Sequence, residues 1–101
     1  MRIARVVGSA VSTAKEASLV GHKLLLVREA DEQGEPAGGI FVAVDAVGAG
    51  TGELVLVAEG SAARRTARTA GGGNGGQPVD AVILGILDSL EVGGTVTFRK
   101  Y

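Results

Sequence analysis

Residues 40–57 read IFVAVDAVGAGTGELVLV, two aliphatic runs joined by a loop with three glycines. Short runs rich in Val, Ile, Leu and Phe and bounded by glycine are typical of β-strands. Glycine supplies the positive φ angles that tight turns require. This stretch therefore predicts a strand over residues 40–47, a turn over 48–53 and a second strand over 54–57.

Strands are also expected on both sides of this stretch. Residues 2–13 show period-two character with β-branched residues, and Gly8 marks a bulge or a close backbone approach. Residues 22–29 form a strand that is apolar on both faces in its middle, so it is either well buried in a barrel or meets another subunit. Residues 30–36 hold turn chemistry. After Gly93 and Gly94, residues 95–100 form a last strand.

Three segments interrupt this β pattern. Residues 62–68 are rich in Ala and Arg and suit one or two helical turns, while residues 71–76 form a glycine-rich loop. Residues 78–90 place apolar side chains at i, i+3, i+4, i+7, i+8 and i+11 and begin with Pro78, which favours a helix. The apolar residues 82–87 also suit a strand. The fold class expected is mainly β, a small five-stranded OB-like β-barrel with one or two short helices.

Length and composition limit the possible classes of protein. The chain has 101 residues, room for a single domain over 1–101. Hydrophobic residues make up 46% of the chain and aromatic ones 3%, so Val, Leu, Ile and Ala must build the core. The chain has no cysteine, which excludes disulfides and thiolate metal sites and fits a reducing cytosol. No segment approaches the ~20 apolar residues that a membrane helix needs. We expect a cytoplasmic protein with no membrane partner.

Residues that could carry chemistry are few. The loop 48–53 resembles a phosphate-binding loop only in its glycines, since it leads into a strand and carries Glu53 where such loops hold a lysine. His22 is the only histidine and is expected at the surface. Asp45, Asp80 and Asp88 lie beside apolar runs, where carboxylates cap turns or meet arginines of a neighbouring subunit. No set of nucleophile, base and orienting group can be assembled, so we expect no enzyme, no cofactor and no metal site.

A barrel of the OB type raises single-stranded nucleic-acid binding as the alternative function. Such binders stack bases on aromatic rings within a basic groove. The chain carries ten Lys and Arg against eleven Asp and Glu, a net charge of −1, which argues against a nucleic-acid partner. The candidate aromatic and basic residues are Phe41, Phe98, Tyr101, Arg64, Arg65 and Arg68. The arginines have no aromatic residue between them, which favours a solvated face or a contact with another subunit.

Five stretches, in order along the chain, carry a resemblance to a known family. They are residues 2–11 (RIARVVGSAV), 18–27 (SLVGHKLLLV), 42–53 (VAVDAVGAGTGE), 60–64 (GSAAR) and 78–88 (PVDAVILGILD). In this spacing they resemble the EutN/CcmL family of bacterial microcompartment vertex proteins. One departure is the glycine-rich segment 71–76, where the family has a short polar loop.

The resemblance implies a structural protein of the microcompartment shell, in carboxysomes or catabolic compartments. Its partners would be four further copies of itself, in a homopentamer that closes a vertex, and hexameric shell proteins around it. A ring requires two different complementary patches on each subunit. Within this reading, subunit contacts or the central axis are expected near a set of small residues and two charged ones. The set is Gly48, Ala49, Gly50, Gly52, Glu53, Gly60, Ser61 and Arg64. Alternatively these residues only shape turns within one barrel.

Overall fold

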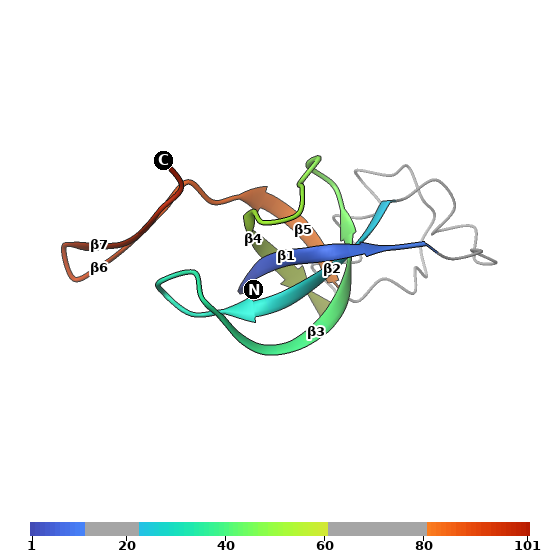
Figure 1. The fold of residues 1–101 in the computed structure, drawn as a ribbon, viewed down its shortest axis with the longest axis horizontal. Coiled ribbons are helices and arrows are strands. Elements are labelled where there is room, and N and C mark those ends of the chain that lie inside the picture. Colours follow the sequence, from blue (N-terminus) through green and yellow to red (C-terminus); the bar gives the residue numbers. More distant parts are fainter. Residues whose placement is uncertain (12–22, 61–80) are drawn as a thin grey trace.

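The computed structural model describes residues 1–11, 23–60 and 81–101, and this part of the chain is built from β-strands (Figure 1). The strands are β1 (Arg2–Ala10), β2 (Lys23–Ala30), β3 (Pro36–Asp45), β4 (Leu54–Glu59), β5 (Ala81–Ile86), β6 (Ser89–Val92) and β7 (Thr95–Arg99). Strands β1 to β5 close a barrel in the order β1-β2-β3-β5-β4. The expected five-stranded barrel is therefore confirmed.

Four barrel strands lie where the sequence predicts them. The strands expected over 2–13, 22–29, 40–47 and 54–57 correspond to β1, β2, β3 and β4 within the described residues. The pairing of β1 with β2 shifts by one residue between Val6 and Gly8, which is the bulge expected at Gly8. Neighbouring barrel strands are antiparallel except β3 and β5, which run parallel through Val44 and Asp45.

The prediction of a helix over residues 78–90 is wrong for residues 81–90, the part of this segment that the structure describes. Residues 81–86 form β5, which pairs with β4 and β3, and residues 89–92 form β6. Val82 and Ile83 point to opposite faces of β5, yet both are fully buried. A strand buried on both faces has no alternation of apolar and polar residues. Its continuous apolar run therefore also contains residues at helical spacing, which is why the sequence favoured a helix here. The helical turns expected over 62–68 and the loop over 71–76 lie outside the described residues.

The last strand does not take part in the barrel. Residues 95–99 form β7, as expected for a strand, but β7 pairs only with β6 in a separate two-stranded sheet. We call β6 and β7 with their turn, residues 89–99, the hairpin. Figure 1 shows the hairpin extending away from one end of the barrel. The fifth barrel strand is thus β5 and not the C-terminal one.

The barrel core is aliphatic, as the composition requires. Its buried members are Ala4, Val6, Leu25, Val27, Ala43, Ala49, Val55, Val57, Ala81 and Ile83. Phe41 and Ile86 are partly buried and pack against them. Each fully buried Val, Leu or Ile contributes about 1.5–3 kcal/mol relative to an exposed position. This core fixes the ends of the strands, and so the loops that they carry.

Strand β2 carries apolar residues on both faces, as expected. Leu25 and Val27 point into the barrel core. Leu24, on the other face, packs against a second buried cluster formed by Val44, Ala58 and Val82. Leu26 follows Leu24 on that outward face and is only partly buried. Part of the outward face is therefore covered within the chain, and part is open.

Candidate functional site

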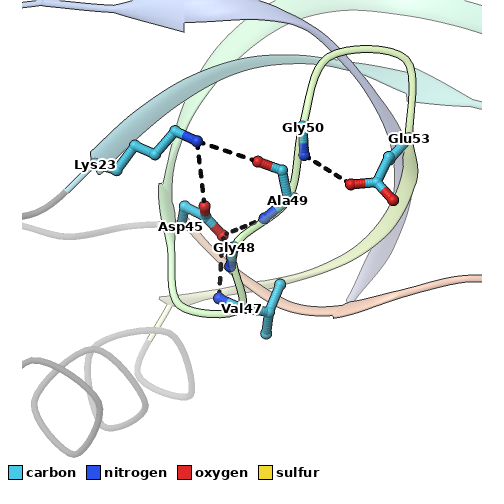
Figure 2. A network of polar contacts seen from close by, with 7 residues as sticks. All are labelled: Lys23, Asp45, Val47, Gly48, Ala49, Gly50 and Glu53. Carbon is cyan, nitrogen blue, oxygen red and sulfur yellow. Dashed lines mark hydrogen bonds and ion pairs between the residues drawn. The ribbon is translucent and has the colours of Figure 1, made fainter.

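Asp45, the last residue of β3, organises the loop that contains most of the candidate contact residues. We call residues 48–53 the glycine loop. The Asp45 side chain is 2% exposed, and its Oδ1 accepts hydrogen bonds from the N–H groups of Val47 (3.0 Å), Gly48 (3.0 Å) and Ala49 (3.2 Å) (Figure 2). One carboxylate oxygen thus satisfies three successive backbone donors. The expectation that an aspartate beside an apolar run caps a turn is confirmed here.

Lys23 contacts the same loop from the start of β2. Its Nζ lies 4.0 Å from Asp45 Oδ2 and donates a hydrogen bond of 3.3 Å to the carbonyl oxygen of Ala49. The Lys23 side chain is 58% exposed, so water screens this ion pair strongly. Lys23 therefore contributes little to the stability of the loop compared with Asp45.

Glu53 closes the other end of the glycine loop. Its Oε1 accepts a hydrogen bond of 2.7 Å from the N–H of Gly50, and its Oε2 lies 2.8 Å from Lys100 Nζ. The hydrogen bond from Lys100, and then that from Gly50, lowers the pKa of Glu53, and the same hydrogen bond raises the pKa of Lys100. Glu53 thus joins its own loop to the C-terminal end of the hairpin.

Arg5 of β1 holds three segments together at this end of the barrel. Its Nη1 donates to the carbonyl oxygen of Gly52 (2.9 Å), and its Nε donates to that of Gly34 (3.0 Å) in the turn between β2 and β3. Its guanidinium lies 5.5 Å from the centre of the Phe98 ring in β7. Arg5 therefore fixes the base of the hairpin against the glycine loop and the β2–β3 turn.

A second charged group lies around the start of β1. Arg2 Nη2 donates to Glu59 Oε2 at 2.7 Å, and Arg2 Nη1 lies 3.7 Å from Glu29 Oε2. The hydrogen bond between Arg2 and Glu59 raises the pKa of Arg2 and lowers the pKa of Glu59. The Arg2 guanidinium also lies 4.3 Å from the centre of the Phe41 ring. This group links β1, β2, β3 and β4 and so supports the barrel itself.

The candidate residues fall into two groups in the structure. Gly48 and Gly52 are exposed and have φ angles of 79° and 94°, which confirms that the loop needs glycine for its turns. Gly60 is also exposed, whereas Ala49 is buried in the barrel core. Ser61 and Arg64 lie outside the described residues. Among the candidates that the structure describes, Gly48, Gly52 and Gly60 are therefore exposed, whereas Gly50 and Glu53 are half-buried.

Sequence reasoning missed Arg5, Lys100 and Gly34 as parts of this site. Arg5 occupies an ordinary outward position of a predicted strand, and Lys100 follows the last strand. Their partners lie 29 to 47 residues away along the chain. No local pattern in the sequence marks such distant contacts.

The charged groups of this site have their partners within the chain. Asp45 and Glu53 bind backbone donors and lysine ammonium groups of their own chain. Among residues 1–11, 23–60 and 81–101, no group of three or more His, Cys, Asp or Glu could hold a metal ion. His22 and Asp80 lie outside these ranges. In the same part of the chain, no helix is long and apolar enough to span a membrane.

The fold and the site define a class of protein, a small closed β-barrel with a projecting hairpin. Charged side chains of this protein join the loops of the barrel to one another and to the base of the hairpin. Comparison with known proteins identifies the family within this class. The family model described as "Ethanolamine utilisation protein EutN/carboxysome" matches residues 1–88. The chain therefore belongs to the EutN/CcmL family, as the resemblance in the sequence suggested.

Individual relatives cover almost the whole chain. The carboxysome shell vertex protein CcmL of Synechocystis sp. is 46% identical over 100 residues, which are 99% of this chain and 95% of the relative. The structure of CcmL from Gloeobacter violaceus superposes with a TM-score of 0.85 at 45% identity and covers 99% of this chain and 98% of its own. The GrpN pentameric microcompartment shell protein from Rhodospirillum rubrum has a TM-score of 0.77 at 40% identity, with 91% and 99% covered.

Proposed function

We propose that this chain is a vertex protein of a bacterial microcompartment shell, which forms homopentamers and catalyses no reaction. The observation that carries this proposal is the 46% identity to a carboxysome shell vertex protein over 99% of the chain, together with the shared barrel. A pentameric relative supports the number of subunits. In this proposal residues 1–101 form one vertex domain that works in the cytoplasm as part of the shell.

The physical reason for a pentamer is geometric. A sheet tiled by hexagonal units is flat, so pentagonal units must be inserted before it can enclose a volume. Hexameric shell proteins are therefore the second partner that we propose. Subunits in a ring meet through two different surfaces, because each contact is heterologous and closes only after the last copy is added.

Within the ring, we place the glycine loop and the segment around Gly60, with Ser61 and Arg64, at subunit contacts or near the central axis. The exposure of Gly48, Gly52 and Gly60 supports this placement, since a backbone without side chains allows another chain to approach closely. Glu53 already pairs with Lys100 of its own chain, so it would act there by holding the loop in shape.

Native mass spectrometry tests the proposed assembly. Five copies of the 10.1 kDa chain should give one closed species of roughly 50 kDa. Co-expression with a hexameric shell protein should yield closed shells in electron micrographs, whereas the hexamer alone should yield open sheets or tubes. A chain that remains a monomer at high protein concentration would contradict the proposal.

Charge reversal tests the proposed contact residues. Glu53→Lys and Arg64→Glu should each reduce the pentameric fraction at a fixed protein concentration. If both variants assemble as the unmodified chain does, these residues shape only their own barrel.

The nucleic-acid alternative gains no support from these observations. The ring of Phe41 packs with Arg2 and the ring of Phe98 lies beside Arg5, so each already has a cationic partner within its own chain. Phe41 lies in β3 of the barrel, whereas Phe98 lies in β7 of the separate two-stranded sheet. A nucleic-acid binder would show affinity for single-stranded DNA that falls steeply with salt.

A further inference from the structure

The hairpin has a single covalent connection to the barrel in the part of the chain that the structure describes. The backbone leaves β5 after Ile86 and enters β6 through Leu87 and Asp88. Strands β6 and β7 pair with each other and with no strand of the barrel. Rotation about a few backbone bonds at such a junction is enough to swing a whole element. The direction of the hairpin must therefore be fixed by non-covalent contacts.

The contacts that fix the hairpin come from its C-terminal side and converge on the glycine loop. Lys100 Nζ lies 2.8 Å from Glu53 Oε2, and the centre of the Phe98 ring lies 5.5 Å from the guanidinium of Arg5. Arg5 in turn donates a hydrogen bond of 2.9 Å to the carbonyl oxygen of Gly52. Both attachments therefore depend on the last two residues of the glycine loop. We call these two attachments the latch.

The latch completes a closed cycle of contacts around the junction. The N–H of Leu87 donates to the carbonyl oxygen of Leu54 (2.8 Å), and the N–H of Lys100 donates to that of Asp88 (2.8 Å). Leu54 follows Glu53 directly, so the cycle returns to the carboxylate that binds Lys100. The side chains of Lys100 and Glu53 are 28% and 25% exposed, so water screens their ion pair and it opens easily. The junction can turn once this pair is open.

The conformation of the glycine loop decides whether its latch residues are in position. Glu53 Oε1 accepts a hydrogen bond of 2.7 Å from the N–H of Gly50, which orients the carboxylate. Gly52 has a φ angle of 94°, and its N–H donates to the carbonyl oxygen of Val6 (2.8 Å). The carbonyl group that Arg5 binds keeps its direction only while the loop keeps this conformation.

We infer that the latch couples the glycine loop and the hairpin as one two-state element. The hairpin is held in a single direction while the loop is in place, and it swings about Leu87 and Asp88 when the loop is disturbed. The coupling is reciprocal, so a molecule that favours one conformation of the loop also shifts the hairpin, and the reverse holds for the hairpin. The inference concerns one chain and goes beyond the proposed function, so it does not depend on assembly.

Single-molecule energy transfer measures the direction of the hairpin within one chain. The chain has no cysteine, so Ser9→Cys in β1 and Thr95→Cys beside the turn of the hairpin accept two dyes at exposed positions. Figure 1 shows that β1 runs away from the hairpin, so a swing of the hairpin changes the separation of the dyes. At picomolar concentration each labelled chain is observed alone, and its diffusion time confirms a monomeric mass. The unmodified chain should give one narrow distribution of transfer efficiency.

Loss of a latch residue should populate the released hairpin. Lys100→Met should raise the ratio of released to latched chains about two- to fivefold, the range of a partly exposed ion pair. Arg5→Met should raise it about tenfold, because the contact with the ring and the hydrogen bonds to carbonyl oxygens are lost. Arg28→Met is the matched control, since Arg28 lies directly opposite Arg5 on β2 and donates to Gly38, outside the latch. A ratio that stays unchanged in both latch variants would overturn the inference.

Gly52→Ala tests the coupling from the side of the loop. A Cβ at Gly52 meets nothing within 4 Å, so the substitution strains the loop backbone without touching the hairpin. The ratio of released to latched chains should nevertheless rise about fivefold or more. Gly60→Ala is the control, because Gly60 also has a positive φ angle of 68° and open space around it but lies outside the glycine loop. Equal ratios in the two variants would overturn the coupling and leave the vertex function standing.

Discussion

Replacing Asp45 is expected to destabilise the barrel because its side chain holds the start of the glycine loop. Asp45→Ala removes the acceptor of three backbone N–H groups, and Asp45→Asn keeps an oxygen in the same place without its charge. The two variants therefore separate the loss of the acceptor from the loss of the charge.

The structure gives the expected size of the effect. Ala49 is 1% exposed, so in Asp45→Ala its N–H remains buried without a partner, which costs about 1–3 kcal/mol. The N–H groups of Val47 and Gly48 lie in exposed residues and can bind water, and together they add about 1 kcal/mol. We expect Asp45→Ala to lose about 2–4 kcal/mol of a total stability of about 5–15 kcal/mol. Asp45→Asn should lose about 1 kcal/mol, since neutral hydrogen bonds are weaker than charged ones.

Urea denaturation at one fixed protein concentration measures these differences, because assembly contributes to apparent stability. With a slope near 2 kcal/mol per molar urea, the midpoint of Asp45→Ala should fall by about 1–2 M. Lys23→Met is the control and should stay within about 0.5 kcal/mol, because Lys23 is largely exposed. An alanine variant as stable as the unmodified protein, or an asparagine variant as unstable as alanine, would refute this account of the loop.

Two further predictions concern the base of the hairpin. Gly34→Ala should cost about 1–3 kcal/mol in urea denaturation, since a Cβ there would lie 2.7 Å from the nearest guanidinium nitrogen and 2.8 Å from the aromatic ring. Gly39→Ala meets nothing within 4 Å and should be neutral, and equal costs for the two glycines would contradict the packing described. The pKa of Glu53 lies below its usual value of 4.5 because of its hydrogen bond with Lys100, so the attachment is fully present above about pH 4.5 and is lost as the pH falls through the lowered pKa. The protection factors of the hairpin amides, which correct for the intrinsic pH dependence of exchange, should fall on this acidification in the unmodified protein and stay unchanged in Glu53→Gln, and identical acid responses in the two proteins would argue against the ion pair.

The sequence predicts the first four barrel strands because their composition and flanking turns are local signals. Strands β1 to β4 are rich in β-branched residues and are bounded by glycine or by turn chemistry. The glycine loop was also predictable, since Gly48 and Gly52 adopt the positive φ angles that such loops require. These features need no knowledge of the rest of the fold.

The contacts that join distant segments could not be predicted in this way. Glu53 was expected only as a candidate near subunit contacts or the central axis, and its ion pair with Lys100 of its own chain was not foreseen. Arg5 reaches Gly52 and Gly34 only because the barrel brings β1 beside two separate turns. Such partners are determined by the arrangement of the strands in space. They therefore cannot be read from local sequence patterns before the complete fold is known.

Strands without alternation have two physical causes, and the structure separates them. In β5, Val82 is fully buried although it faces away from the core residue Ile83, so the chain itself covers both faces. In β3, Val42 also faces away from the core but remains 49% exposed, with Leu26 opposite it on β2. Within one sequence the two strands look alike, since each has apolar residues at successive positions. Exposure therefore distinguishes a face that the chain itself covers from a face that it leaves open to solvent, and the open face lies on β2 and β3.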